Sequence, residues 1–199
     1  MRKFDLAVVG SGAGLVVLEA ALDAGVSCAI VERAKFGGTC LNKGCIPTKI
    51  LAYPADLIRE VQHAEKTGVH VSSPGVDWQT LSERMWKQIG LNRAIEKQLL
   101  GAENLAVFKG AGEFTGPGTM RVVSSDGKTE EFEAKRFVLA AGARSFVPPI
   151  RGIGEAGYVV SETFFGDRFP KTPWKSLVLI GGGPIGVEFA HIFSALGTQ

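Results

Sequence analysis

The feature that most constrains this chain is a short apolar run that leads through a glycine-rich turn into a helical pattern. Residues 4–9 form the run, residues 10–14 the turn, and residues 13–24 have apolar side chains at helical spacing. A second apolar run, residues 28–31, follows directly. Strand, glycine turn, helix and strand in this order open a parallel dinucleotide-binding sheet. The sequence therefore predicts an α/β, Rossmann-like fold.

The first turn carries most of a pyrophosphate-binding fingerprint. Gly10 and Gly12 occupy its first two glycine positions, and Leu15 stands at the third, where Gly or Ala is usual. The third glycine normally allows close packing of the helix on the strand. We therefore expect either a slightly displaced helix or compensation by Gly14. Glu32 ends the second apolar run and can accept hydrogen bonds from a ribose diol, so the turn is expected to bind a dinucleotide.

The same pattern recurs near the end of the sequence. Residues 177–180 are expected to form a buried strand, and a helix is expected from about Pro184. Between them, Gly181, Gly183 and Gly186 fill all three glycine positions of the fingerprint. The acidic ribose ligand would lie about 20 residues further on, past the last residue. The sequence therefore does not distinguish NAD from NADP.

The middle of the chain contains helical patterns followed by short strands. Apolar side chains recur at helical intervals over residues 46–66, and Asp77 is suited to cap a long helix that reaches about Leu100. The pair Asp126-Gly127 is typical of a β-hairpin turn, and residues 143–157, rich in Pro and Gly, indicate a linker. Five strand-like pieces precede this linker, at residues 105–108, 111–115, 119–124, 129–133 and 136–140.

Composition argues against several classes of protein. Hydrophobic residues make up 45% of the chain, and 22 Lys and Arg are scattered among 20 Asp and Glu, without the basic stripe that binds nucleic acid. Glycines interrupt the N-terminal apolar run too early for a signal peptide. No stretch approaches the roughly 20 apolar residues of a membrane span. We therefore expect a cytoplasmic protein with no nucleic-acid or membrane partner.

Two cysteines lie five residues apart in the segment GGTCLNKGCIPTK, residues 37–49. In a regular helix, Cα atoms at this spacing are roughly 8–9 Å apart, whereas a disulfide needs about 4.4–6.8 Å. Cys40 and Cys45 can therefore pair only if the backbone leaves the helix between them. Gly44 relaxes the chain there, and Pro47 suits the first turn of a helix, which would leave Cys45 at a helix N-terminus.

The cysteine spacing alone leaves three interpretations open. A redox pair is one, and Lys49 would then share the face of Cys45 one turn further on. Two core cysteines with a surface lysine is the second. A metal site is disfavoured, because the three histidines are dispersed and no second Cys or His pair lies at ligand spacing. The third cysteine, Cys28, stands in an apolar run and is expected to be a buried strand residue.

Segment 37–49 resembles the redox-active segment of the pyridine nucleotide–disulfide oxidoreductases, a family that includes dihydrolipoamide dehydrogenase and the glutathione, mycothione and mercuric reductases. The two glycine turns flank it in the family's order. The resemblance covers the whole chain but only about the first two-fifths of a full-length enzyme, which would be a homodimer. It implies an FAD-binding domain with a β-meander over residues 1–150 and the start of an NAD(P)-binding domain over residues 151–199.

The resemblance also implies roles for the redox residues. Cys40 matches the exposed interchange thiol that reacts with the substrate, and Cys45 matches the inner thiol in charge-transfer contact with the flavin. Lys49 matches the lysine beside the flavin N5 edge, and Glu188 matches its ion-pair partner.

The cofactor contacts follow from the same comparison of motifs. Gly112 matches a backbone contact to the adenosine side, and residues 139–143 match a motif near the flavin, with Ala141 where Thr is usual. The expected FAD contacts are Gly10, Gly12, Gly14, Glu32, Gly38, Thr39, Cys45, Lys49, Gly112, Ala141 and Gly142, and the expected NAD(P) contacts are Gly181, Gly183 and Gly186.

The implied reaction passes electrons between NAD(P)(H), FAD and the cysteine pair, and so to a small-molecule or lipoyl-domain dithiol or disulfide. Oxidation of dihydrolipoamide is the first expectation. A mycothione, glutathione or mercuric reductase is the alternative, although the mercuric enzymes need a further C-terminal cysteine pair that this chain does not contain. A second class of hypothesis is an inactive nucleotide-binding fragment, because the family's catalytic His and its Glu partner belong to a C-terminal domain.

Overall fold

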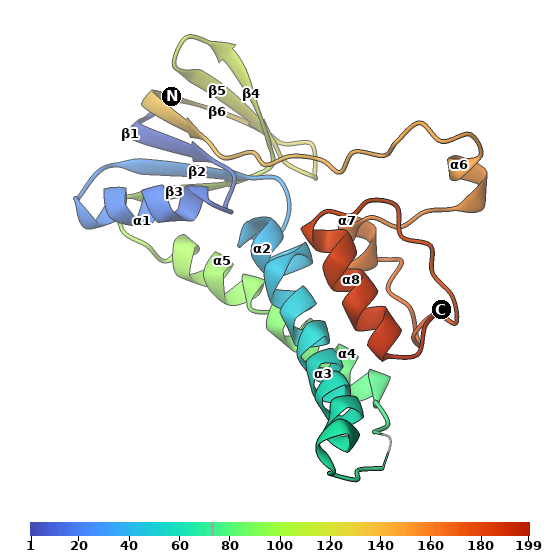
Figure 1. The fold of residues 1–199 in the computed structure, drawn as a ribbon. Coiled ribbons are helices and arrows are strands. Elements are labelled where there is room, and N and C mark those ends of the chain that lie inside the picture. The colour runs from blue at the N-terminus through green and yellow to red at the C-terminus, as the bar shows by residue number, and fades with distance from the viewer. Residues whose placement is uncertain (73) are drawn as a thin grey trace. The chain divides into compact units, whose positions relative to one another are not determined.

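A computed structural model describes residues 1–72 and 74–199 (Figure 1). Contacts between Cα atoms divide the chain into two compact units, and each is described by itself. The first unit consists of residues 1–42 and 90–146, and the second of residues 43–89 and 147–199.

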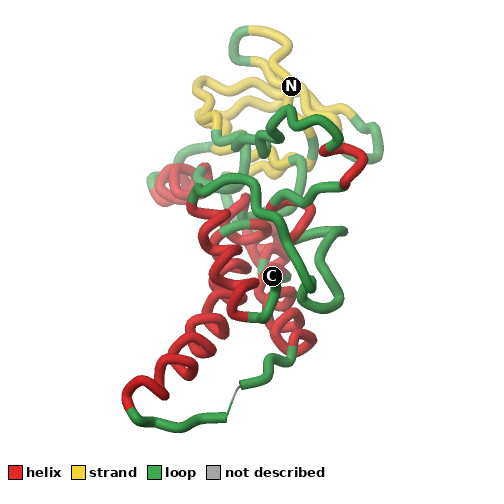
Figure 2. The backbone as a smooth tube through the Cα atoms, turned by 45° about the vertical axis from the view of Figure 1, so that its right-hand side comes forward, coloured by secondary structure: helices red, strands yellow, loops and turns green. Residues whose placement is uncertain are grey.

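The first unit is built on a six-stranded sheet with the order β3-β2-β1-β6-β5-β4, whose strands are yellow in Figure 2. Strands β1, β2 and β3 run parallel, and β6 pairs parallel with β1 over residues 132–139. Strand β6 also pairs antiparallel with β5 over residues 129–133, and β5 pairs antiparallel with β4, which forms the meander. The predicted α/β fold with a meander is confirmed. The strands are β1 (Arg2–Val9), β2 (Cys28–Glu32), β3 (Leu105–Lys109), β4 (Ala111–Gly116), β5 (Thr119–Val123) and β6 (Thr129–Leu139).

Alternation of side chains along the parallel strands covers both faces of this sheet. One face of β1 and β2, with Ala7, Ala29 and Val31, packs against aromatic and aliphatic side chains of the meander such as Phe132. The opposite face, which includes Ile30, packs against the helices α1 (Gly14–Asp23) and α5 (Asn92–Leu100). Burial on both faces explains why the parallel strands are short, nearly continuous apolar runs. The unit also contains most of α2 (Gly38–Lys43).

The meander follows the predicted pieces with one difference. Gly127 has φ +80° and its N–H donates to the carbonyl of Ser124 at 3.0 Å, so the Asp126-Gly127 hairpin is confirmed. The pieces predicted at 129–133 and 136–140 are a single strand, β6. No turn residue lies between them, and Ala134 continues the pairing by donating its N–H to Gly118 at 2.9 Å. One strand thus belongs to both the meander and the parallel sheet.

The second unit packs helices around an aromatic core. Phe164, Phe189 and Phe193 are buried there beside the indole of Trp78, which stacks on Phe169 with ring centroids 5.4 Å apart. The helical elements are α3 (Cys45–Ala64), a 3₁₀ turn η1 (Glu65–Thr67), α4 (Trp78–Ile89), α6 (Ile153–Ala156), α7 (Ser161–Phe164) and α8 (Pro184–Ala195). The helices expected over 46–66 and from Pro184 are confirmed.

The helix expected from Asp77 to Leu100 is two helices. Asp77 does cap α4: its carboxylate accepts the backbone N–H of Thr80 at 3.1 Å and the hydroxyl of Thr80 at 2.7 Å. These bonds hold the pKa of Asp77 below its usual value. The chain then leaves the helix at Gly90, where α4 ends in one unit and α5 begins in the other. Glycine has low helix propensity, but the burial of α4 and α5 in different cores decides the break.

The buried strand expected at residues 177–180 is a wrong prediction. These residues have no strand structure, and Val178 is 85% exposed. Leu177 donates its N–H to Gln199 at 2.8 Å, and Gln199 donates to Lys175 at 3.0 Å, the pattern of a single parallel bridge. A parallel strand needs neighbours to satisfy its backbone and cover its faces. Within the described residues, this bridge is the segment's one strand-like contact.

Candidate redox and dinucleotide site

The first glycine turn lies at the carboxyl ends of β1, β2 and β6. Gly10 donates its N–H to Val31 at 2.8 Å, and Ala140 donates to Val9 at 2.8 Å. Gly10 has φ +98°, and a Cβ there would come within 2.2 Å of the carbonyl oxygen of Ala140. Only glycine fits such an approach without displacing the backbone. The turn and the Ala140-Ala141-Gly142 run are therefore brought together as expected.

Gly14 supplies the close helix–strand packing that the fingerprint's third glycine normally gives. It is the buried first residue of α1, and a Cβ there would meet Cγ1 of Val8 at 2.6 Å and Cβ of Ala140 at 3.1 Å. Leu15, at the fingerprint position, packs partly buried against the apolar cluster on that face. Of the two expected consequences of Leu15, the structure shows compensation by Gly14.

Glu32 reaches back to the glycine turn from the end of β2. Its carboxylate accepts the backbone N–H of Ser11 at 2.9 Å, the hydroxyl of Ser11 at 2.6 Å and the N–H of Ala34 at 2.8 Å. A carboxylate has about four acceptor positions, so one position is left for a diol. Ser11 is fully buried and also accepts the N–H of Gly37 at 3.2 Å. Sequence reasoning missed Ser11, whose position between two fingerprint glycines is its one signal.

These residues fit the adenosine diphosphate part of FAD. No side chain among the described residues caps the N-terminus of α1, so its first N–H groups are available to a phosphate. At Gly12 a Cβ would meet nothing closer than Cα of Gly38 at 3.5 Å, so this part of the turn is open. Gly112 on β4 packs against Val31, next to Glu32. The backbone donors and the carboxylate thus lie at one edge of the sheet.

Replacing Glu32 with alanine is expected to weaken FAD retention roughly tenfold or more, because a charge-assisted hydrogen bond contributes about 1.5–3 kcal/mol. The measurement is flavin absorbance per polypeptide after dialysis at limiting FAD. Since Glu32 also holds Ser11, Ser11→Ala is the matched control: it removes the hydroxyl and leaves the carboxylate. Ser11→Ala should retain more flavin than Glu32→Ala. Equal retention in Glu32→Ala and the parent chain would show that Glu32 does not hold the ribose.

The backbone leaves the helix between the two motif cysteines. Helix α2 ends at Lys43, Gly44 has φ −144° and ψ −121°, and α3 begins at Cys45. Cys45 therefore stands at a helix N-terminus, and Pro47 lies in the first turn. Both the expected break and the expected position of Cys45 are confirmed. Cys40 and Cys45 are exposed, but they belong to different units, so their approach to disulfide distance stays a prediction.

Cys28 is a core residue, as expected. It is fully buried in β2 among the side chains that pack under α1 and α5. Burial, and secondarily the charge of Asp5, raises the pKa of the Cys28 thiol. A thiol held protonated in an apolar core is unreactive. Cys28 is therefore not a candidate redox residue, unlike the two exposed cysteines.

Lys49 on α3 forms an ion pair with Glu188 on α8, so the predicted pairing is confirmed. The side chain of Lys49 is 65% exposed, and that of Glu188 is 33% exposed. Exposed pairs contribute only about 0–1 kcal/mol to stability. The pair therefore matters more for the charge it places near Cys45, one turn away on α3, than for holding the helices together.

Lys49 and Cys45 also line a shallow hollow between α3 and α4 with a volume of about 420 Å³. Its other lining residues are mostly apolar or long side chains: Ile46, Ile50, Tyr53, Arg84 and Gln88. The hollow gives the thiol of Cys45 an accessible, partly apolar surrounding.

The second glycine turn is closed by its third glycine. A Cβ at Gly186 would lie 2.1 Å from the carbonyl oxygen of Gly181, which itself has φ +111°. Gly183 is the N-cap of α8 and Pro184 its first residue, a position that suits proline. The turn thus has the form expected of a pyrophosphate-binding loop, although the segment before it is not a strand.

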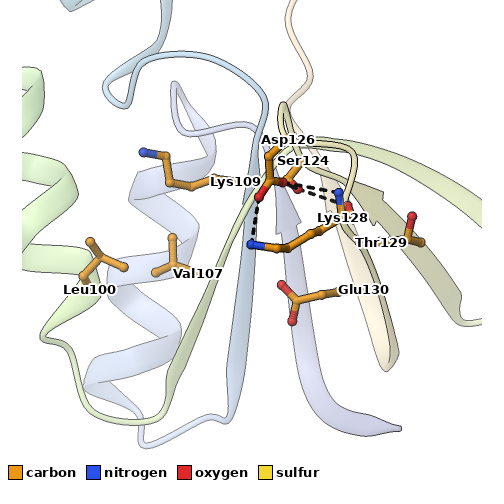
Figure 3. Close-up of a pocket in the computed structure, with 8 residues that line it drawn as sticks. All are labelled: Leu100, Val107, Lys109, Ser124, Asp126, Lys128, Thr129 and Glu130. Carbon is orange, nitrogen blue, oxygen red and sulfur yellow. Dashed lines mark hydrogen bonds and ion pairs between the residues drawn. The ribbon is translucent and has the colours of Figure 1, made fainter.

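A second hollow, of about 490 Å³, lies in the first unit between the end of α5, β3 and the β5–β6 hairpin (Figure 3). Its lysines form ion pairs: Lys128 with Asp126 at 2.9 Å, and Lys109 with Glu96 at 2.5 Å. No thiol or glycine turn lines it. Across residues 1–72 and 74–199 there is no group of three potential metal ligands, and no helix in this range is long and apolar enough to span a bilayer.

Comparison with known proteins identifies relatives of this chain. Residues 4–199 match the family model described as pyridine nucleotide-disulphide oxidoreductase. The chain is 34% identical to a mycothione reductase of Mycobacterium tuberculosis, over 100% of this chain and 43% of the relative. It is 32% identical to a dihydrolipoyl dehydrogenase of Chlamydia pneumoniae, over 100% of this chain and 42% of the relative.

A solved structure shares the fold. The HOCl-induced flavoprotein disulfide reductase of Escherichia coli, solved as a Cu(II) complex, matches with a TM-score of 0.83 and 29% identity, over 100% of this chain and 42% of that chain. The present chain spans about two-fifths of the length of the relatives it matches. Because the family model covers nearly the whole sequence, the chain belongs to the pyridine nucleotide-disulphide oxidoreductase family.

Proposed function

We propose that this chain is the flavin-binding and redox-active part of an FAD-dependent disulfide oxidoreductase that acts as a homodimer. Members of the family are FAD-dependent and use NAD(P)H. The observation that carries the proposal is the helix break at Gly44, which leaves the exposed thiol of Cys45 at the N-terminus of α3, one turn from the Lys49–Glu188 pair. A buried structural cysteine pair would have neither this exposure nor this charge beside it.

In the proposed reaction, Cys40 exchanges with the substrate and Cys45 is its redox partner. A substrate dithiol gives up two electrons and two protons to become a disulfide, and the Cys40–Cys45 disulfide is reduced to two thiols. Bound FAD would supply a two-electron carrier between these thiols and the nicotinamide. The chain's own contribution is to hold the thiols, the Lys49 cation and the glycine turns.

Dihydrolipoamide is our first proposed substrate, and the disulfides of mycothiol and glutathione and the mercuric ion are the alternatives. Support for dihydrolipoamide is the presence of dihydrolipoyl dehydrogenases among the relatives. The relatives also include mycothione reductases at similar identity. The substrate is identified by comparing kcat/KM values of the full-length protein. Dihydrolipoamide is assayed with NAD, and the disulfide substrates are assayed with NADH or NADPH. A preference for mycothiol disulfide would replace the lipoamide assignment and keep the reaction class.

The cysteine pair is testable in the chain itself. After mild oxidation of the folded chain, we expect only one of its three thiols to react when the thiols are titrated in denaturant. Peptide mapping should then find Cys40 joined to Cys45. Cys40→Ser and Cys45→Ser should each prevent this internal bridge, whereas Cys28→Ser should not. An oxidised chain that keeps three thiols, or joins Cys28, would contradict the proposed function.

Removing the Glu188 carboxylate is expected to raise the flavin midpoint potential. Lys49 would lose its countercharge, and an unneutralised cation favours the reduced, more negative flavin. We expect a shift on the order of 30 mV, equivalent to a tenfold change in a two-electron equilibrium. The matched control is Asp56→Ala, which breaks the 2.7 Å contact between Asp56 and His191 on the same two helices. The potential is measured by dye equilibration. An equal potential in Glu188→Ala and the parent protein would show that the Lys49–Glu188 pair does not influence the flavin.

A further inference from the structure

Two asparagines form a buried amide pair beside the cysteine segment. Asn42, on α2, and Asn92, the first residue of α5, are each 8% exposed. The amide nitrogen of Asn92 donates to Oδ1 of Asn42 at 3.0 Å. The amide nitrogen of Asn42 donates to the carbonyls of Phe36 at 2.8 Å and Gly38 at 2.9 Å. Because carbonyls only accept, these two bonds fix the orientation of the Asn42 side chain.

The loop held by Asn42 is also attached to the first glycine turn. Gly37 donates its N–H to the hydroxyl oxygen of Ser11 at 3.2 Å. The same hydroxyl donates a hydrogen bond to the carboxylate of Glu32. Gly38 lies so close to the turn that a Cβ there would be 2.4 Å from Cα of Gly12. Residues 36–38 are therefore clamped between the amide pair on one side and the proposed FAD turn on the other.

Cys40 lies in the short helix that begins inside this clamp. It stands in α2, which has only six residues, two positions before Asn42. Isolated helices of that length are not stable in water, so contacts with the rest of the unit must hold α2 in place. Asn42 supplies one such contact, to Phe36 just before the helix, while its bond to Gly38 lies within α2. Asn92 supplies another, and it connects Asn42 to α5, whose Leu99 is in the core.

We infer that the Asn42–Asn92 amide pair is a positioning device for the interchange thiol, which keeps α2 and Cys40 fixed on the glycine turn. The inference rests on the proposed function, because it assumes that Cys40 exchanges with Cys45. Loss of the clamp lets Cys40 sample more positions. The effective concentration of one thiol at the other then falls, and so does the equilibrium constant for closing the disulfide.

The test compares Asn42→Leu and Asn92→Leu with the parent chain loaded with FAD. The ratio of closed disulfide to dithiol is measured by acid trapping and mass spectrometry in buffers of defined reduced and oxidised glutathione. Each substitution is expected to lower the closing constant about tenfold. Asn92→Leu is the sharper variant, because Asn92 is distant in sequence from both cysteines and leaves the bonds of Asn42 to Phe36 and Gly38 in place.

The matched control is Ser82→Ala. The hydroxyl of Ser82 donates to the carbonyl four residues earlier in α4, at Trp78, just as Asn42 donates to Gly38 in α2. Ser82→Ala should leave the closing constant unchanged although it also removes a helical side-chain bond. Circular dichroism identifies any variant that fails to fold. If Asn42→Leu does not fold, Asn92→Leu carries the test alone.

The outcomes separate the two proposals. A parent chain that closes the disulfide, with Asn92→Leu closing it about tenfold less, supports the inference. Equal closing constants in the parent and a folded Asn92→Leu would overturn the inference and leave the proposed function standing. A parent chain that forms no Cys40–Cys45 disulfide under any glutathione ratio would overturn both. A loss of melting temperature in Asn92→Leu without any change in the closing constant would assign the pair a purely structural role.

Discussion

Residues 1–199 expressed alone and loaded with FAD are expected to form NADH from dihydrolipoamide at least about 10²-fold more slowly than a dihydrolipoyl dehydrogenase. A positioned general acid–base group typically contributes 10²–10⁴ in rate, and the resemblance assigns that group to a histidine in a C-terminal domain that this chain does not match. The three histidines of this polypeptide are His63, His70 and His191, and none stands in a motif matching that histidine.

The structure of the second unit supports this expectation. His191 is on α8, and its ring contacts Asp56, which lies 11 residues beyond Cys45 on α3 and so about 16 Å along the helix. His63 is 18 residues beyond Cys45 on the same helix, about 27 Å away. A catalytic base must reach its proton within about 2.6–3.2 Å or through one water. The second glycine turn also follows a segment without strand structure, so we expect a nicotinamide to bind weakly there.

The measurement is NADH absorbance at equal flavin concentration, with a dihydrolipoyl dehydrogenase as the positive reference and free FAD as the blank. Retained flavin and an intact cysteine bridge must be shown in the same sample, so that inactivity is not mistaken for loss of cofactor. Turnover within about tenfold of the reference would mean that a group in this chain performs the acid–base step. In that case His63→Ala, His70→Ala and His191→Ala would identify it.

Features set by neighbouring residues in the sequence were predictable. The hairpin at Gly127, the cap at Asp77 and the break at Gly44 each depend on a side chain or glycine acting on its own few residues. Short continuous apolar runs likewise predicted the parallel strands β1 and β2 of the first unit. Even the ion pair of Lys49 with Glu188, 139 residues apart, followed from motifs that the resemblance assigned to one site.

Features set by distant neighbours were not predictable in this way. The apolar sequence of residues 177–180 is typical of a buried strand. A buried strand also needs neighbouring strands, however, and Val178 is exposed. The helical pattern from Asp77 to Leu100 does not show that its two halves pack into different cores. Asn92 stands outside every motif, and its bond to Asn42 spans 50 residues. No local pattern identifies such a partner, because the contact exists only after the sheet and helices have packed.

Gly12→Ala and Gly14→Ala are expected to separate cofactor binding from packing within one turn. At Gly14 a methyl group would overlap Cγ1 of Val8, at 2.6 Å, inside a buried helix–strand contact. Overpacking of this kind costs about 1–3 kcal/mol, which for a chain of this size lowers the melting temperature by roughly 2–12 °C. At Gly12 the nearest atom is Cα of Gly38, at 3.5 Å, so a methyl group fits the protein.

Gly12→Ala should therefore melt within about 2 °C of the parent chain without FAD, yet lose most of its flavin. The second fingerprint glycine lets the backbone approach the pyrophosphate, and the methyl group would occupy that space. We expect flavin retention to fall about 10²-fold, measured as absorbance per polypeptide after dialysis, equivalent to about 2.7 kcal/mol of binding free energy. Gly14→Ala should lower the melting temperature more than Gly12→Ala does, and should lose less flavin than Gly12→Ala. If Gly12→Ala retained its flavin while Gly14→Ala lost it, the pyrophosphate would have to lie further along α1, and the fingerprint glycines would serve only to pack the helix on the sheet.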